Sequence, residues 1–168
     1  MKVKLHDSAL RQAAGQGMDA FIQVVVDAIS DYVGGSLTPE ALQVLSPDHV
    51  TLWGYTILRS ELCEGGFIQL IHNGYGPFFF LNPFAKAMRL WGLRDFSKFL
   101  YRGRELYDTH RAEIEQDLTD EEFMALYERF PEFDDLDDEF IVNEEETTTL
   151  IAHYLDDHLL DFVDIIPD

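Results

Sequence analysis

The chain has 168 residues, of which 46% are hydrophobic and 13% aromatic, which is enough apolar material to exclude general disorder. Its 32 acidic and 12 basic side chains give a formal net charge of −20, so nucleic acid and anionic membranes would repel it. No segment approaches the roughly 20 apolar residues of a membrane span. Residues 1–17 lack the apolar stretch of a signal peptide. We therefore expect a cytoplasmic protein, with one domain over 1–168 and a flexible segment at 1–17.

Helical patterns dominate the first part of the chain. Apolar residues recur at helical spacing from 18 to 33, and Gly34-Gly35 marks the end of that helix. Thr38-Pro39 and Ser46-Pro47 each have the form of an N-cap followed by proline at the first helical position. The second pair predicts a helix that runs as far as Gly65-Gly66.

The middle of the chain also predicts helices. A short helix is expected over 67–72, followed by a turn at Tyr75-Gly76-Pro77. The spacing of Phe84, Met88 and Trp91 indicates a further helix that ends at Gly92. A long apolar face over 96–114 predicts the longest helix of this part.

The last part of the chain predicts two further helices and one packed acidic tract. Thr119 and Glu122 have the spacing of a capping box, and Pro131 should end the helix that they open. Apolar residues interrupt the acidic tract 134–146, so we expect it to pack, and a final helix covers 150–162. The prediction is an all-α single compact domain of about seven or eight helices. Its core should include Phe21, Ile29, Leu58, Phe67, Trp91, Phe99, Phe123 and Tyr154.

The negative charge is concentrated in the last third of the chain. Residues 1–111 hold 11 acidic and 11 basic side chains, whereas residues 112–168 hold 21 acidic side chains and one basic one, Arg129. Seven bases lie between residues 86 and 111, but pairing each with an acid would leave most of the acids uncompensated. The residues 112–168 thus form a strongly acidic helical part.

Catalytic and metal-binding patterns are weak. Cys63 is the one cysteine, which excludes an internal disulfide, and its place beside Leu62 suggests a buried structural thiol. Four acids fall at positions 1, 3, 5 and 12 of an EF-hand loop: Asp135, Asp137, Glu139 and Glu146. Position 6 is Phe140 where the loop needs glycine, which argues against a calcium site. We assign no catalytic, cofactor-binding or metal residues and expect no enzyme.

The stretch 61–76 carries the most distinctive motif. Two glycines should break one helix and let the next begin at an angle, while Gln69 and Asn73, four residues apart, should bond to backbone at the bend. On physical grounds this is a structural corner. Its defining residues are Gly65, Gly66, Phe67, Gln69, Asn73 and Gly76.

The same stretch resembles the Gly-Gly-Phe-x-Gln…Asn-x-x-Gly signature of a bacterial DNA-mimic protein family of the neisserial nineteen-kilodalton type. The resemblance extends to 133–140 and to the last helix, and covers about 40–165, although Glu64 stands where the family often has Asn. It implies an all-α fold and a homodimer. It also implies that carboxylates take the place of DNA phosphates and sequester a helix-turn-helix-type transcription factor.

The spacing of the acids suits such mimicry. Acids at i and i+4 of a helix lie about 6 Å apart along its axis, close to two phosphate steps of about 3.4 Å on one DNA strand. The candidate partner-binding residues are Asp117, Asp120, Glu121, Glu128, Glu132, Asp134, Asp135, Asp137, Asp138, Glu144, Glu145, Glu146, Asp156, Asp157 and Asp161.

Two alternatives to the DNA mimic stay open. One is an acidic immunity protein that inhibits a basic nuclease toxin, and the other is an uncharacterised enzyme or metal-binding domain. A homodimer is also expected because the run 77–81, Pro-Phe-Phe-Phe-Leu, is more apolar than a free loop should be.

Overall fold

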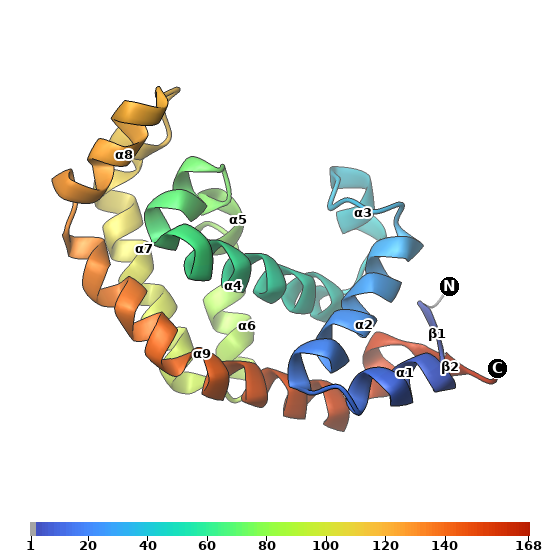
Figure 1. Cartoon of the computed structure of the whole chain (residues 1–168). Coiled ribbons are helices and arrows are strands. Elements are labelled where there is room, and N and C mark those ends of the chain that lie inside the picture. The colour runs from blue at the N-terminus through green and yellow to red at the C-terminus, as the bar shows by residue number, and fades with distance from the viewer. Residues whose placement is uncertain (1–2) are drawn as a thin grey trace. The chain divides into compact units, whose positions relative to one another are not determined.

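The computed structural model describes residues 3–168, and these contain ten helices and two short strands (Figure 1). The all-α prediction is confirmed, with short helices raising the number above seven or eight. In chain order the elements are β1 (Lys4–His6), α1 (Asp7–Ala14), α2 (Met18–Tyr32), α3 (Pro39–Val44), α4 (Pro47–His72), α5 (Gly76–Phe80), α6 (Phe84–Leu90), α7 (Arg94–Ile114), α8 (Asp120–Arg129), α9 (Glu132–Asp157), α10 (Leu159–Phe162) and β2 (Asp164–Ile166).

The described chain divides into two compact units. The terminal unit comprises the described residues up to Thr56 together with Thr148–Asp168, and the central unit comprises Ile57–Thr147. The long helices α4 and α9 each contribute residues to both units. The single domain expected over 1–168 stays a prediction.

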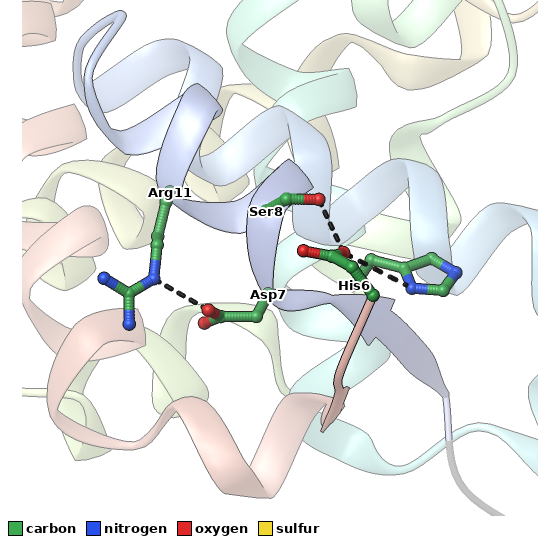
Figure 2. A network of polar contacts seen from close by, with 5 residues as sticks. His6, Asp7, Ser8 and Arg11 are labelled. Carbon is green, nitrogen blue, oxygen red and sulfur yellow. Dashed lines mark hydrogen bonds and ion pairs between the residues drawn. The ribbon is translucent and has the colours of Figure 1, made fainter.

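The terminal unit joins the two ends of the described chain. Strand β1 pairs in parallel with β2, with Leu5 opposite Ile165. The Ser8 hydroxyl donates to Asp168 Oδ1 at 2.6 Å, and His6 Nδ1 lies 3.7 Å from the same oxygen (Figure 2). The segment for which flexibility is predicted therefore contains β1 and α1, and its side chains contact the C-terminal residue.

The core of the central unit is built around Phe67. Its ring lies with centroid separations of 6.0 Å from Phe80, 5.5 Å from Phe99 and 6.4 Å from Phe133, and the residue is fully buried. Such aromatic contacts each contribute about 0.5–1.5 kcal/mol beyond the area they bury. A Cβ at Gly103 would lie 3.0 Å from the Phe67 ring, so a glycine there admits the ring against α7.

The apolar run 77–81 is divided between core and surface: Phe79 and Phe80 are buried, Phe78 is half-buried, and Pro77 and Leu81 are exposed. Helix α5 begins at Gly76, so part of the turn expected at Tyr75-Gly76-Pro77 is helical instead. The short helix buries Phe79 and Phe80. A Cβ at Gly76 would collide with the Tyr107 ring, which explains the glycine there without a role in turn formation.

The predicted core is confirmed for six of its eight residues, which are buried: Phe21, Ile29, Leu58, Phe67, Trp91 and Phe99. Phe123 and Tyr154 are only half-buried. On α8 the buried residue is Leu126, and the Phe123 ring instead covers His72 at a centroid distance of 4.8 Å. The Tyr154 ring stacks on His158 at 4.0 Å, near the end of α9. Each ring therefore has a neighbour on one side and solvent on another.

The acidic tract and the last predicted helix form one continuous helix. The sequence 132–157 contains neither glycine nor proline, so nothing breaks the helix between the two segments. The capping box that precedes it is confirmed. Thr119 Oγ1 accepts from the Glu122 N–H, and Glu122 Oε1 accepts from the Thr119 N–H, both at 3.2 Å.

Candidate functional site

The candidate site of the central unit is its acidic segment, residues 117–146, which includes α8 and the first half of α9, drawn in shades of orange in Figure 1. Most of its candidate carboxylates are exposed to solvent. They are Asp117, Asp120, Glu121, Glu128, Glu132, Asp134, Asp135, Asp138, Glu145 and Glu146. Because most of them stand on helices, the backbone fixes the spacing of their Cα atoms.

On α9 the exposed carboxylates form a row with an apolar interruption. Asp134 and Asp138 are one turn apart, about 6 Å along the axis. Ile141 and Val142 follow on exposed positions, with 52% and 80% of their surface accessible, before acids resume at 145 and 146. The row can therefore offer a partner both charge and an apolar contact.

Little positive charge from the rest of the chain reaches this row. Arg102 on α7 forms an ion pair with Glu139, while Arg111 and Arg104 pair within or next to α7, with Glu115 and Asp108. Among residues 3–168, no ion pair involves Asp134, Asp135 or Asp138. The basic stretch 86–111 thus leaves most of the negative potential of the acidic segment uncompensated.

Two of the expected partner-binding carboxylates are half-buried and engaged within the central unit. Glu144 is half-buried and accepts from Arg59 Nε at 2.5 Å. Asp137 is half-buried, and its Oδ1 accepts from the backbone N–H of Phe67 at 2.9 Å. Burial raises the pKa of Asp137 to about 7, with smaller contributions from Asp134 and Asp138, while the bond from Phe67 opposes the rise. Of the candidate acids at 134, 135, 137 and 138, Asp137 is therefore the one that is not exposed.

The Gly-Gly corner lies where α4 bends. Gly66 has φ 75° and ψ −169°, which interrupts the helical backbone in a region that favours glycine. A Cβ at Gly66 would collide with the Asp137 carboxylate, and one at Gly65 would collide with the Gln69 side chain. The Tyr127 hydroxyl of α8 donates to the Gly65 carbonyl at 2.7 Å. The corner therefore contacts both helices of the acidic segment.

The polar residues of the corner have a partner that the sequence did not reveal. Gln69 Nε2 and Asn73 Nδ2 donate to the same oxygen, Glu61 Oε2, at 2.9 and 3.0 Å. The expectation that both amides bond to backbone is wrong. The spacing of eight and twelve residues from Glu61 could have indicated the contact, but only for a helix that continues past the bend.

The remaining candidates lie in the terminal unit. Asp156, Asp157 and Asp161 are exposed at the end of α9 and in α10. Burial raises the pKa of Tyr154, with Asp48 and Asp161 adding to the rise. These acids form a separate group within the terminal unit.

The structure gives no support to a calcium loop. Asp135, Asp137, Glu139 and Glu146 all lie on helix α9, and an EF-hand needs a loop there. Within residues 3–168, no group of three or more histidine, cysteine or acidic side chains is arranged to hold a metal ion. Over the same residues, no helix has the length and apolar character needed to cross a membrane.

Cys63 is exposed, contrary to the expected buried thiol. It follows the buried Leu62 on α4, and successive residues on a helix point about 100° apart, so a buried neighbour does not bury the next residue. Partial desolvation of the thiol raises its pKa, Glu144 raises it further and Arg59 lowers it.

Two comparisons with known proteins agree with this description. A family model described as DMP19-like protein matches residues 43–158, a range that contains the Gly-Gly corner and the whole acidic segment. Over 118 residues the chain is 36% identical to the DNA mimic protein DMP19 of Neisseria meningitidis serogroup B (strain ATCC BAA-335 / MC58). That match covers 69% of this chain and 71% of the neisserial protein. The chain therefore belongs to the DMP19-like protein family.

Proposed function

We propose that this protein is a DNA mimic that binds a basic DNA-binding protein, a helix-turn-helix-type transcription factor, and blocks its binding to DNA. The observation that carries the proposal is the set of exposed, helix-borne carboxylates in the acidic segment, of which Asp134, Asp135 and Asp138 have no ion-pair partner among the described residues. The name of the neisserial relative supports the same function. The protein acts in the cytoplasm, where such a partner is found, and without catalysis.

The physical argument is one of charge in excess of what solubility requires. A small domain stays soluble with a net charge of about 2–8, whereas this chain carries −20, most of it on acids of its last third. Such crowding destabilises the folded chain through self-repulsion, and a basic partner relieves that repulsion on binding. Complementary charge also raises the association rate, which suits a competitor of DNA.

The homodimer remains part of the proposal on the strength of the family resemblance. The apolar run 77–81 does not support it, because Phe79 and Phe80 fill the core of the central unit. Light scattering at micromolar concentration tests the dimer, and a single species of 19.4 kDa would contradict it.

The function is tested by capture and competition. Proteins from the native lysate that bind the immobilised chain are eluted with salt and identified, and the captured protein is then titrated with its own DNA site. We expect this protein to displace the DNA as its concentration rises, and to do so less well at high salt. A captured protein that binds DNA equally well in its presence would contradict mimicry. A captured nuclease whose activity is inhibited would support the immunity alternative instead.

A further inference from the structure

We propose that Asp137 and Tyr127 are positioning residues, which attach α9 and α8 to the peptide groups on either side of Gly66 and so set the placement of the two carboxylate-bearing helices. The consequence for binding rests on the proposed function, because the placement of the carboxylates matters only if a partner recognises it. The structural part stands on contacts within the central unit.

The bend in α4 leaves backbone groups that need partners. A helix that ends has carbonyls without an intrahelical donor, and a helix that begins has N–H groups without an acceptor. At Gly66 the helical backbone is interrupted, so Gly65 closes one helical part and Phe67 opens the next. The Tyr127 hydroxyl donates to the Gly65 carbonyl at 2.7 Å, and Asp137 Oδ1 accepts from the Phe67 N–H at 2.9 Å.

Each of the two contacts comes from a different acidic helix. Tyr127 stands on α8 and Asp137 stands on α9, 62 and 70 residues along the chain from their respective partners. Two hydrogen bonds to neighbouring peptide groups therefore fix both helices to one short segment of backbone.

The glycine at 66 is part of the same arrangement. Its positive φ makes the bend, and its lack of a Cβ leaves space that the Asp137 carboxylate occupies. A Cβ at this position would displace the carboxylate and break its bond to Phe67. The distinctive glycine of the motif thus admits the residue that holds α9.

Two acidic groups influence the Asp137 carboxyl. Asp134 and Asp138 of α9 raise its pKa. The pKa of the Tyr127 hydroxyl on α8 is raised by burial and then by Asp137 and Glu61, which places these groups in the same electrostatic neighbourhood. The Phe67 N–H is therefore the favourable contact for the carboxyl, which distinguishes this acid from Glu144, which is paired with Arg59.

The proposal is tested by the distance between α8 and α9 in the chain alone. Spin labels are placed at Met124→Cys and Val142→Cys, two positions with 62% and 80% of their surface exposed, in a chain whose native thiol is removed by Cys63→Ser. An excess of unlabelled chain suppresses distances between protomers. Pulsed electron resonance then gives the distribution of label separations, and circular dichroism reports whether each variant keeps its helices.

We expect Asp137→Ala and Tyr127→Phe to shift or broaden the distribution. Asp137→Asn keeps an oxygen that accepts from the Phe67 N–H, so it should restore the parent distribution. Asp138→Ala, an exposed acid on the next residue of α9, is the matched control and should leave the distribution unchanged.

Parent-like distributions for both Asp137→Ala and Tyr127→Phe would overturn the proposal. A distribution for Asp137→Asn as broad as that for Asp137→Ala would also overturn it, because the acceptor would then not be what matters. If Asp137→Ala does not fold, the conservative Asn and Phe variants decide, and loss of fold in both would contradict a positioning role. Since no partner is present, these results are independent of whether the chain mimics DNA.

Discussion

Asp137 and Phe67 are 70 residues apart in the chain, yet Asp137 Oδ1 accepts the backbone N–H of Phe67 at 2.9 Å. The bond places a carboxylate inside the central unit, where burial opposes its ionisation. The same acid therefore combines a fixed backbone contact with a strongly raised pKa.

The raised pKa predicts a pH dependence of stability. Burial first, and then Asp134 and Asp138, move the pKa of Asp137 from 3.8 to about 7, so the folded state binds its proton more tightly than the unfolded state. The contribution of this tighter proton binding to the free energy of unfolding is complete below about pH 4, and it is lost as the pH rises through about 7. Asp137→Asn should remove this decline.

Urea unfolding at several pH values measures the effect. The free energy of unfolding of the parent, minus that of Asp137→Asn, should fall between about pH 4 and about pH 7 and level off above that range. Asp135→Asn, on an exposed acid that does not contribute to the raised pKa of Asp137, controls for the loss of one negative charge. A difference between parent and Asp137→Asn that stays constant with pH would contradict the raised pKa.

The bend at Gly66 predicts that two glycines with positive φ differ in their tolerance of alanine. Gly66 and Gly74 have φ of 75° and 91°, so alanine is strained at both. At Gly74 a Cβ would meet nothing within 4 Å, whereas at Gly66 it would meet the Asp137 carboxylate. Gly74→Ala should cost about 1–3 kcal/mol, and Gly66→Ala should cost more, because it breaks the Asp137 contact as well.

Thermal and urea unfolding of the two variants checks this difference. In Asp137→Ala chains the excess cost at residue 66 should shrink, because the colliding carboxylate is gone. Equal costs for Gly66→Ala and Gly74→Ala would show that the backbone conformation alone requires the glycine.

Much of the fold could be predicted because its signals are local. The capping box at Thr119 and Glu122 needs residues three apart, and the stops at Gly34, Gly65-Gly66 and Pro131 act on the adjacent backbone. The helical spacing of Phe123 on α8 predicts a core position, but periodicity does not say how much protein covers a given face of a helix.

The contacts of the corner could not be predicted, because they join parts of the chain that are far apart. Asp137 lies four residues after Phe133 and three before Phe140, so helical spacing places it on the apolar face, but the sequence does not indicate which group its carboxylate meets there. The contact arises when α9 lies against the bend of α4 and this carboxylate reaches a free N–H. The role of Glu61 likewise depends on the bend, because the helical part beyond it brings the Gln69 and Asn73 amides within hydrogen-bond distance of the Glu61 carboxylate.

The raised pKa of Cys63 predicts slow alkylation, although the residue is exposed. Desolvation of the thiol and the nearby Glu144 raise its pKa, so less thiolate is present at neutral pH than for a free cysteine. Iodoacetamide should therefore react with Cys63 more slowly than with cysteine in a short peptide. Glu144→Gln should lower the pKa of Cys63 and speed the reaction, because it removes a negative charge and leaves the positive charge of Arg59 in place. The pH at which the alkylation rate of Cys63 reaches half its maximum should be higher than for the peptide cysteine. An equal or lower pH would refute this prediction.

The acidic row of α9 predicts that partner binding depends on where charge is removed. Reversing Asp134, Asp135 and Asp138 to lysine should slow association with the captured partner by at least tenfold at low salt, because complementary potentials act chiefly on the association rate. Helicity should be retained, since all three side chains are exposed. Asp137 is left unchanged, because lysine there would disrupt the corner.

The central claim, that the acidic segment is what the partner recognises, is tested most directly by comparing this triple variant with one of equal charge. Asp19, Asp27 and Asp31 are exposed acids on α2, outside the acidic segment, and their reversal to lysine changes the net charge by the same amount. The measurement is the association rate of each folded variant with the captured DNA-binding protein as salt is raised. We predict a steep loss for the α9 variant and a small one for the α2 variant, with the difference shrinking at high salt. Equal association rates for the two folded variants would contradict the account.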